Sequence, residues 1–237
     1  MHSNSTTIDA AKINISDLQA IIFDFDGTLV DSEPVWKSTF FDLFKKDYGV
    51  EVPQKILWEN TGGGVDLSVL NISNKLELKM SEAEIESVAQ RLHEKMQNNI
   101  LEYLPLREGV TKVFDLAKAN SIQMAVCTAS TNELIESYFS KLGMQELFGV
   151  VVSTSDSDMQ HRKPYPFPYL ETLRLLNVEA NKTLVIEDSP KGITSSVLAG
   201  IDTVAIHNPF LDLTNLENKP KFVVQDFLQV LELFSNE

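Results

Sequence analysis

Apolar residues along the chain fall into two patterns: short continuous runs, and longer stretches in which they recur every three or four positions. Continuous runs that end in polar residues predict buried strands at 20–25, 123–127, 150–153, 183–186 and 203–206. Helical spacing predicts helices at 110–119, 134–142, 169–176 and 193–199. Strands that alternate with amphipathic helices indicate βαβ units. We therefore expect a Rossmann-like α/β fold, with a parallel sheet covered by helices on both faces.

The segment from about residue 37 to 103 departs from this pattern because it contains no convincing strand. Its periodicity predicts helices at 36–46, 67–76 and 82–97. Ser81 with Glu84 three residues later is a capping box, which marks the start of the last helix. We therefore expect an all-helical cap domain at 37–103. The α/β core domain is expected in two pieces, 18–36 and 104–237, and residues 1–17 are expected to form a flexible N-terminal tail.

Composition and charge narrow the class of protein. The 237 residues carry 34 Asp and Glu against 20 Lys and Arg, a formal net charge of −14, so the cationic excess that nucleic-acid binding needs is missing. The hydrophobic share of 43% fits a globular core, yet no apolar run approaches the roughly 20 residues of a membrane span. With no signal region and one cysteine, Cys127, we expect a cytoplasmic protein that binds neither membrane nor nucleic acid.

Two carboxylates stand at the end of the first predicted strand, which leads into Asp24-Phe25-Asp26-Gly27-Thr28. Like charges a few ångströms apart are costly at the end of a buried strand unless a cation lies among them, and a divalent metal meets this need. Ligands of open α/β sheets also bind at the carboxyl ends of the strands. An ordinary Asp-Gly turn explains Asp26 and Gly27 equally well, but it leaves Asp24 unexplained.

Polar groups follow two of the later strands in the same way. Thr128-Ala129-Ser130 comes after the second strand, and hydroxyl and free N–H groups at a helix start form an anion site. Ser130 with Glu133 also fits a capping box, which would explain the serine without a ligand. Further on, Lys163 lies in a Pro-rich loop with His161 and Arg162, where a lone lysine is usually solvated.

A second acid pair, Glu187-Asp188, follows the fourth strand. Ser189 and Pro190 fit a helix N-cap and first helical position, but that interpretation leaves both acids unexplained. Along the chain the order is acid pair, hydroxyl, lysine and acid pair, each at or just beyond the end of a strand. Such a set can hold a divalent cation with carboxylates and a phosphoryl group with Thr and Lys, which indicates phosphoryl transfer.

These motifs resemble those of the haloacid dehalogenase (HAD) superfamily. The run Asp24-Phe25-Asp26-Gly27-Thr28-Leu29-Val30 is similar to the first signature, and the second, third and fourth positions are taken by Thr128, Lys163 and Glu187-Asp188. The helical insert directly after the first motif looks like the small cap of the branch that holds β-phosphoglucomutase and many sugar phosphatases. The resemblance covers almost the whole chain from Ala20 on.

The resemblance implies a catalytic and metal-binding role for the acids. Asp24 would attack phosphorus to give an aspartyl-phosphate, and Asp26 would act as general acid and then general base. Mg²⁺ would be bound by Asp24, the backbone carbonyl of Asp26 and Asp188, with Glu187 supporting it through water or from outside the ligand set. Thr28 would fix Asp26 by hydrogen bonding.

The same resemblance implies a phosphate-binding set. Thr128 and the N–H of Ala129 would hold the phosphoryl oxygens, and Lys163 would offset the charge of nucleophile and phosphate. Asn132, one turn into the following helix, would also reach the ligand. Cys127 lies beside this set, but no histidine is near it in sequence, so it is interpreted as a small buried strand residue.

Phosphatases and mutases both occur in this branch. The linker Asp31-Ser32-Glu33-Pro34-Val35-Trp36 looks like that of hexose-phosphate phosphatases, whereas β-phosphoglucomutase-like sequences commonly have a histidine at the position of Trp36. The cap loop 60–66 also lacks the arginine that is frequent in this branch near Gly64. We therefore expect a Mg²⁺-dependent phosphatase of small phosphorylated metabolites, sugar or polyol phosphates. A phosphosugar mutase and a phospho-acceptor signalling domain are the alternatives.

The cap offers candidates for contact with the substrate. Gly63 and Gly64 belong to a loop of three glycines, which can approach a ligand through its backbone or be a plain interhelical loop. Trp58, His93 and Lys95 are further candidates, although an ordinary helix-surface or core position explains each of them better. The expected partner is a small phosphorylated metabolite, and we expect the protein to be a monomer.

Overall fold

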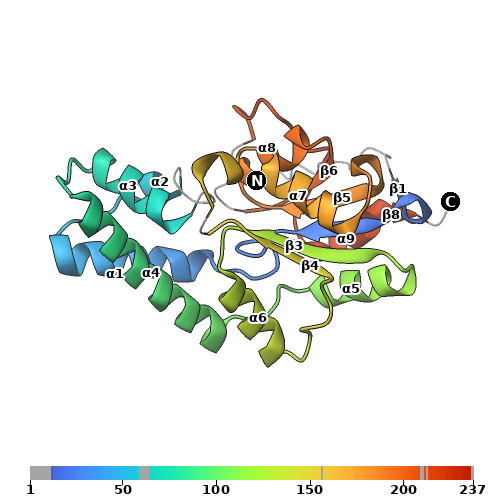
Figure 1. Ribbon diagram of the computed structural model, residues 1–237, viewed down its shortest axis with the longest axis horizontal. Coiled ribbons are helices and arrows are strands. Elements are labelled where there is room, and N and C mark those ends of the chain that lie inside the picture. The colour runs from blue at the N-terminus through green and yellow to red at the C-terminus, as the bar shows by residue number, and fades with distance from the viewer. Residues whose placement is uncertain (1–11, 59–63, 156, 209–210, 212, 236–237) are drawn as a thin grey trace, which may run out of the picture.

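The computed structural model describes residues 12–58, 64–155, 157–208, 211 and 213–235. Figure 1 shows an α/β core and, to one side of it, the helices of the insert. The predicted fold class is confirmed by this architecture.

The core is built on a six-stranded sheet in which every neighbouring pair is parallel. In order across the sheet, the strands are β4 Val150–Ser153, β3 Gln123–Thr128, β2 Ala20–Phe23, β5 Thr183–Glu187, β6 Asp202–Ile206 and β7 Phe222–Val224. The five predicted strands are present, and β7 is an additional edge strand. Phe23 pairs with Val126 on one side and Ile186 on the other, so β2 ends between β3 and β5. The strands that carry the motifs thus end together at one edge of the sheet.

Helices cover both faces of the sheet, because alternate side chains of β2 point to opposite faces and all of them are apolar. Ile21 and Phe23 pack into one apolar cluster, with residues of α5 Val110–Ala119, α6 Asn132–Lys141 and α9 Phe227–Leu233. Ala20 and Ile22 point to the opposite face and pack with residues of α7 Phe167–Leu176 and Ala199, which follows α8 Pro190–Leu198. In Figure 1, α7 and α8 lie above the sheet and α5 and α6 below it.

The described residues of the insert form four helices, with bounds α1 Glu33–Tyr48, α2 Gln54–Trp58, α3 Val65–Lys75 and α4 Glu82–Tyr103. Three of them were predicted, and the capping box of Ser81 and Glu84 is present at the start of α4. Their apolar side chains form a cluster of their own around Phe40, Phe44 and Leu92. The helix α4 is longer than expected, and its last turns leave this cluster.

Met96 and Ile100 on those last turns pack into the core cluster instead. The chain therefore changes from cap to core packing within α4, before its end at Tyr103. The bounds 37–103 of the cap domain stay a prediction.

The two ends of the described chain meet beside the core. The strand β1 Ile13–Asn14 pairs in parallel with β8 Phe234–Ser235, and Ile15 is buried. Residues 13–17 therefore have defined structure, although a flexible tail was expected over 1–17; residues 1–11 of that tail lie outside the described residues. No helix in the described portion of the chain has the length and apolar character needed to cross a membrane.

Candidate active site

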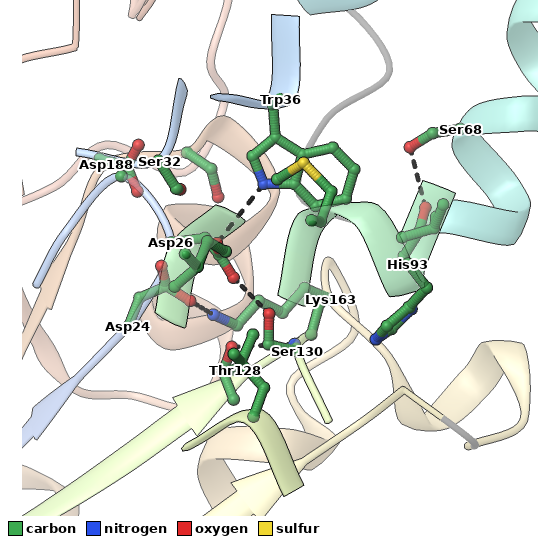
Figure 2. A pocket seen from close by; sticks show the side chains of 18 of the residues that line it. Asp24, Asp26, Ser32, Trp36, Ser68, His93, Thr128, Ser130, Lys163 and Asp188 are labelled. Atoms are coloured by element: carbon green, nitrogen blue, oxygen red, sulfur yellow. Dashed lines mark hydrogen bonds and ion pairs between the residues drawn. The ribbon is translucent and has the colours of Figure 1, made fainter. Parts of the chain in front are cut away.

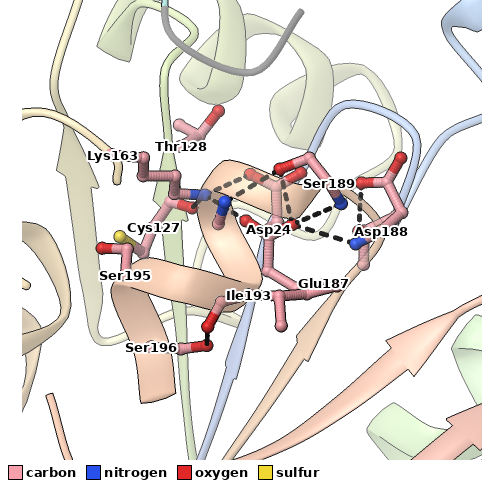
Figure 3. Close-up of polar contacts among 12 residues, drawn as sticks. Asp24, Cys127, Thr128, Lys163, Glu187, Asp188, Ser189, Ile193, Ser195 and Ser196 are labelled. Carbon is pink, nitrogen blue, oxygen red and sulfur yellow. Dashed lines mark hydrogen bonds and ion pairs between the residues drawn. The ribbon is translucent and has the colours of Figure 1, made fainter. Parts of the chain in front are cut away.

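Lys163 reaches the end of β2 and contacts the first acid of the first motif. Its Nζ donates to Asp24 Oδ1 at 2.7 Å, to Glu187 Oε1 at 2.6 Å and to the carbonyl of Cys127 at 3.0 Å (Figure 3). Lys163 is 4% exposed, Asp24 7% and Glu187 0%. The alternative of a solvated loop lysine is therefore wrong, because the ammonium group is held in a buried network that joins three strand ends.

Burial and mutual attraction shift the pKa values of this pair. Burial raises the pKa of the Asp24 carboxyl well above its usual range, although Lys163 acts to lower it. Burial acts to lower the pKa of Lys163, but Asp24 and Glu187 hold that pKa well above its usual value. The lysine is thus a permanent cation next to a carboxylate that is costly to ionise without a further positive charge.

Glu187 has both carboxylate oxygens engaged by the protein. Its Oε1 accepts from Lys163 and from the hydroxyl of Tyr169 at 3.1 Å. Its Oε2 accepts from the backbone N–H groups of Asp188 and Ser189, each at 2.9 Å, and from Ser189 Oγ at 3.1 Å. Glu187 therefore fixes the lysine and the turn that leads into α8. Ser189 caps that helix and Pro190 begins it, as predicted.

Asp188 is held from two loops on either side. Thr28 Oγ1 donates to its Oδ1 at 3.0 Å, and Asn208 Nδ2 donates to its Oδ2 at 3.0 Å. Thr28 was expected to bond Asp26, and that prediction is wrong because the turn directs its hydroxyl across the sheet edge. Gly27 makes this approach possible: its φ is +81°, and a Cβ there would lie 2.1 Å from Asp188 Oδ2.

Three buried carboxylates lie close together at this point. One oxygen each from Asp24, Glu187 and Asp188 lies within 4.8 Å of the others. Lys163 supplies one positive charge against these three acids, so a divalent cation fits the remaining charge. The donors are all oxygens, the ligand type that hard ions such as Mg²⁺ prefer. The chemistry of this donor set therefore fits the predicted metal.

Asp26 faces the pocket and accepts two hydrogen bonds. Ser130 Oγ donates to its Oδ2 at 2.5 Å, and Trp36 Nε1 donates to its Oδ1 at 3.4 Å (Figure 2). One donor comes from the core loop after β3 and the other from the first helix of the insert. The core and the insert thus both orient the carboxylate of Asp26, which lies outside the hydrogen-bond network of Lys163.

Ser130 is a site residue that sequence reasoning missed. The predicted capping box of Ser130 and Glu133 is wrong, because the N-cap of α6 is Thr131, whose side chain accepts from the N–H of Leu134 at 3.2 Å. Two neighbouring hydroxyl residues stand at this helix start, and only one is needed as a cap. That redundancy was the available signal that the other hydroxyl had a different partner.

The phosphate-binding candidates separate into two groups. Thr128, Ala129 and Lys163 line the pocket, and Thr128 Oγ1 accepts from the N–H of Ser130 at 3.0 Å. Asn132, at the first position of α6, is exposed and is absent from the described lining. The structure thus brings the first three to the acids and leaves Asn132 outside the pocket.

The pocket lies between core and insert and encloses about 110 Å³. Its insert side is formed largely by apolar side chains, with Gly64, Ser68, His93 and Gln97 as further members. Among the predicted cap contacts, Gly64 therefore lines the pocket, whereas Gly63 and the side chain of Trp58 lie outside the described residues. His93 also lines it, and Lys95 is exposed on α4.

Besides the bond from Trp36 to Asp26, two further polar contacts join the insert to the core near this pocket. Gln97 Nε2 donates to Thr131 Oγ1 at 2.7 Å. Arg162, next to Lys163 in the chain, pairs with Asp66 at the start of α3, and its Nη1 lies 2.8 Å from both carboxylate oxygens. The described conformation thus has the insert seated on the core.

Cys127 takes no part in the site through its thiol. It is fully buried, and burial raises the pKa of the thiol to about 12, so no thiolate forms at neutral pH. Its backbone carbonyl, not its sulfur, accepts from Lys163. The structure agrees with its interpretation as a small buried strand residue.

The chain is similar to known proteins along most of its length and most of theirs. The chain is 27% identical over 190 residues to a phosphorylated carbohydrates phosphatase of Thermotoga maritima, covering 79% of this chain and 84% of the relative. It is 24% identical over 220 residues to a pyrophosphatase of Bacillus cereus strain G9842, covering 92% and 97%. The crystal structure of β-phosphoglucomutase from Clostridium difficile shares the fold, with a TM-score of 0.78, 23% identity and coverage of 91% and 96%.

Residues 21–206 match the family model described as haloacid dehalogenase-like hydrolase. This match spans more than half of the chain and takes in all four motifs, whose side chains meet at one edge of the sheet. The protein therefore belongs to the haloacid dehalogenase-like hydrolases, as the resemblance of its motifs predicted.

Proposed function

We propose that the protein is a Mg²⁺-dependent phosphatase that hydrolyses small phosphorylated metabolites, sugar or polyol phosphates, through an aspartyl-phosphate on Asp24. The observation that supports this most directly is the contact between Lys163 Nζ and Asp24 Oδ1, at 2.7 Å within a buried carboxylate cluster that borders the pocket. The Thermotoga relative, a phosphorylated carbohydrates phosphatase, supports the substrate class.

In the first step, an oxygen of Asp24 attacks phosphorus while the bond from phosphorus to the ester oxygen breaks. Asp26 gives its proton to that leaving oxygen, and Ser130 and Trp36 hold its carboxyl group in place. In the second step, Asp26 takes a proton from water, which attacks phosphorus and releases phosphate from Asp24. Lys163 and the N–H of Ala129 offset charge on the phosphoryl oxygens, together with Thr128.

The metal would be held by Asp24, Asp188 and the backbone carbonyl of Asp26. Glu187 is saturated by hydrogen bonds to the protein, so its role is to position Lys163 and the turn at Asp188. When bound, a divalent ion neutralises the carboxylates and polarises phosphoryl oxygens, which lets an anionic substrate approach. Thr28 and Asn208 keep Asp188 in position for this contact.

A phosphosugar mutase remains the alternative function, because the β-phosphoglucomutase from Clostridium difficile shares the fold. A mutase transfers the phosphoryl group back to a sugar, so it needs a grip on a second phosphate. Among the described residues that line the pocket, Lys163 is the one Lys or Arg, and it is engaged by Asp24 and Glu187. This charge distribution favours hydrolysis of monophosphates.

The test is phosphate release from a panel of sugar, polyol and nucleotide monophosphates and inorganic pyrophosphate, with Mg²⁺ and with EDTA. We expect release from sugar or polyol phosphates that requires Mg²⁺. A coupled isomerisation assay on sugar 1-phosphates runs in parallel, and isomerisation without net phosphate release would support the mutase. Undiminished release in EDTA would remove the metal from the mechanism.

A further inference from the structure

Ser32 carries a buried hydroxyl group that the protein itself leaves unused. Ser32 is 1% exposed, and its Oγ has no hydrogen-bond partner among the described residues. A hydroxyl group buried without a partner lowers stability, so native proteins seldom keep one without a reason. Ser32 also lines the pocket between core and insert.

Helix capping does not explain this serine. Ser32 occupies the N-cap position of α1, but its backbone has φ −81° and ψ −10° rather than the extended conformation of a capping residue, and its side chain makes no cap hydrogen bond. Its backbone is fully employed, because its N–H donates to the carbonyl of Val30 and its carbonyl accepts from the N–H of Trp36. Of the polar atoms of Ser32, only the side-chain oxygen lacks a hydrogen-bond partner among the described residues.

The position of Ser32 links it to the leaving group of the ester. Ser32 lines the same pocket as Asp26 and is joined to Trp36, the residue that bonds Asp26, through the first backbone hydrogen bond of α1 (Figure 2). In the proposed mechanism Asp26 protonates the leaving oxygen, so this part of the pocket faces the organic portion of the substrate. The phosphoryl group itself is bound, in the same mechanism, by Thr128, Ala129 and Lys163.

Two other polar side chains of the pocket are already bonded within the protein, whereas His93 lines it as a further polar group. Ser68 Oγ donates to the carbonyl of Gly64 at 2.8 Å, and Gln97 Nε2 donates to Thr131. Around them the insert contributes apolar side chains, among them Phe40 and Leu57. A ligand that enters this half of the pocket therefore meets Ser32 as a hydroxyl ready both to donate and to accept.

We propose that Ser32 is a substrate-binding residue that hydrogen-bonds a hydroxyl group of the leaving alcohol. It thereby favours esters of polyhydroxylated alcohols over alkyl phosphates of the same length. This inference rests on the proposed phosphatase function and assigns a share of its substrate selectivity to one side chain.

The experiment compares sorbitol 6-phosphate with n-hexyl phosphate, which has the same carbon count and no free hydroxyl group. Ser32→Ala should lower kcat/KM for sorbitol 6-phosphate about tenfold, the value of one buried hydrogen bond, and leave hexyl phosphate within about twofold. The melting temperature of the variant should equal or exceed that of the wild type, because no protein hydrogen bond is lost. Ser38→Ala serves as the matched control, since Ser38 lies exposed on the same helix and bonds only locally to Val35.

An equal loss on both esters with a lowered melting temperature would make Ser32 a structural residue and overturn the inference. Unchanged kcat/KM on both esters would overturn it as well. In both cases the wild type still releases phosphate, so the proposed function stands. If the wild type releases phosphate from neither ester, nor from any other ester of the panel, the proposed function fails and the inference falls with it.

Discussion

Gly192 in α8 lies directly against the carboxylate of Glu187. A Cβ at position 192 would be 1.6 Å from Glu187 Oε1, the oxygen that accepts from Lys163. The absence of a side chain at 192 therefore sets the position of the acid, and through it the position of the lysine beside Asp24.

Gly192→Ala should damage both stability and turnover. The methyl group cannot coexist with Glu187 in its present place, and overpacking of this kind costs about 1–3 kcal/mol of unfolding free energy. Because Glu187 must move, Lys163 loses a partner, and we expect kcat to fall more than tenfold. Denaturant unfolding and phosphate-release kinetics check this. Gly149→Ala is the control, since nothing lies within 4 Å of the added atom; if both variants behave alike, Gly192 has no such role.

Asp24→Asn should abolish turnover while the fold is retained. Its stability effect in the metal-free protein depends on pH, because burial raises the pKa of Asp24 in the folded state. The wild type therefore loses stability as pH rises from the unfolded value of about 3.9 through that raised pKa, whereas the amide has no charge to bury. The melting temperatures, measured in EDTA from pH 4 to 8, should diverge in favour of the variant as pH rises. Parallel curves would contradict the raised pKa.

Ser130→Ala and Thr131→Ala should affect different properties although the two residues are neighbours. Ser130 bonds Asp26, so its loss should lower kcat about tenfold by releasing one hydrogen bond to the acid, with little change in stability. Thr131 caps α6 and accepts from Gln97 of the insert, so its loss should reduce unfolding free energy by about 1 kcal/mol. Steady-state kinetics and thermal unfolding of both variants distinguish the roles. An unchanged kcat in Ser130→Ala would exclude the serine from the orientation of Asp26.

The pair of Arg162 and Asp66 should control how firmly the insert sits on the core. Asp66→Asn and Arg162→Gln each remove the ion pair, so we expect faster amide hydrogen exchange at the start of α3 and a several-fold higher KM, with kcat little changed. Because both remove the same contact, the double variant should add little to either single one. Additive effects would show that the two side chains act separately.

Much of the fold could be predicted because its signals are local. The core strands are continuous apolar runs, and most helices are long enough to show their period. The helix Gln54–Trp58 was missed since five residues are too few for a periodic pattern. The pairing of Ile13–Asn14 with Phe234–Ser235 depends on two chain ends meeting in space, for which neither segment carries a signal.

The candidate site shows the same division. That Asp24, Thr128 and Asp188 meet follows from strand ends sharing one sheet edge, which order along the chain predicts. Lys163 lies in the loop well beyond the end of β4, so its place beside them was predicted by the resemblance of the motifs. Which donor bonds which acceptor does not follow, because it depends on the path of each loop. Thr28 accordingly bonds Asp188 instead of Asp26, and Ser130 takes the place beside Asp26.

The helix α4 has a mechanical consequence for catalysis. At 22 residues it is about 33 Å long, with Leu92 anchored in the cluster of the insert and Met96 and Ile100 in the core. Because one continuous helix is seated in both clusters, we expect a displacement of the insert to tilt α4 against the core. Gln97 follows Met96 and donates to Thr131, the neighbour of Ser130. We therefore expect movement of the insert to alter the position of the Asp26 carboxylate, which Ser130 contacts.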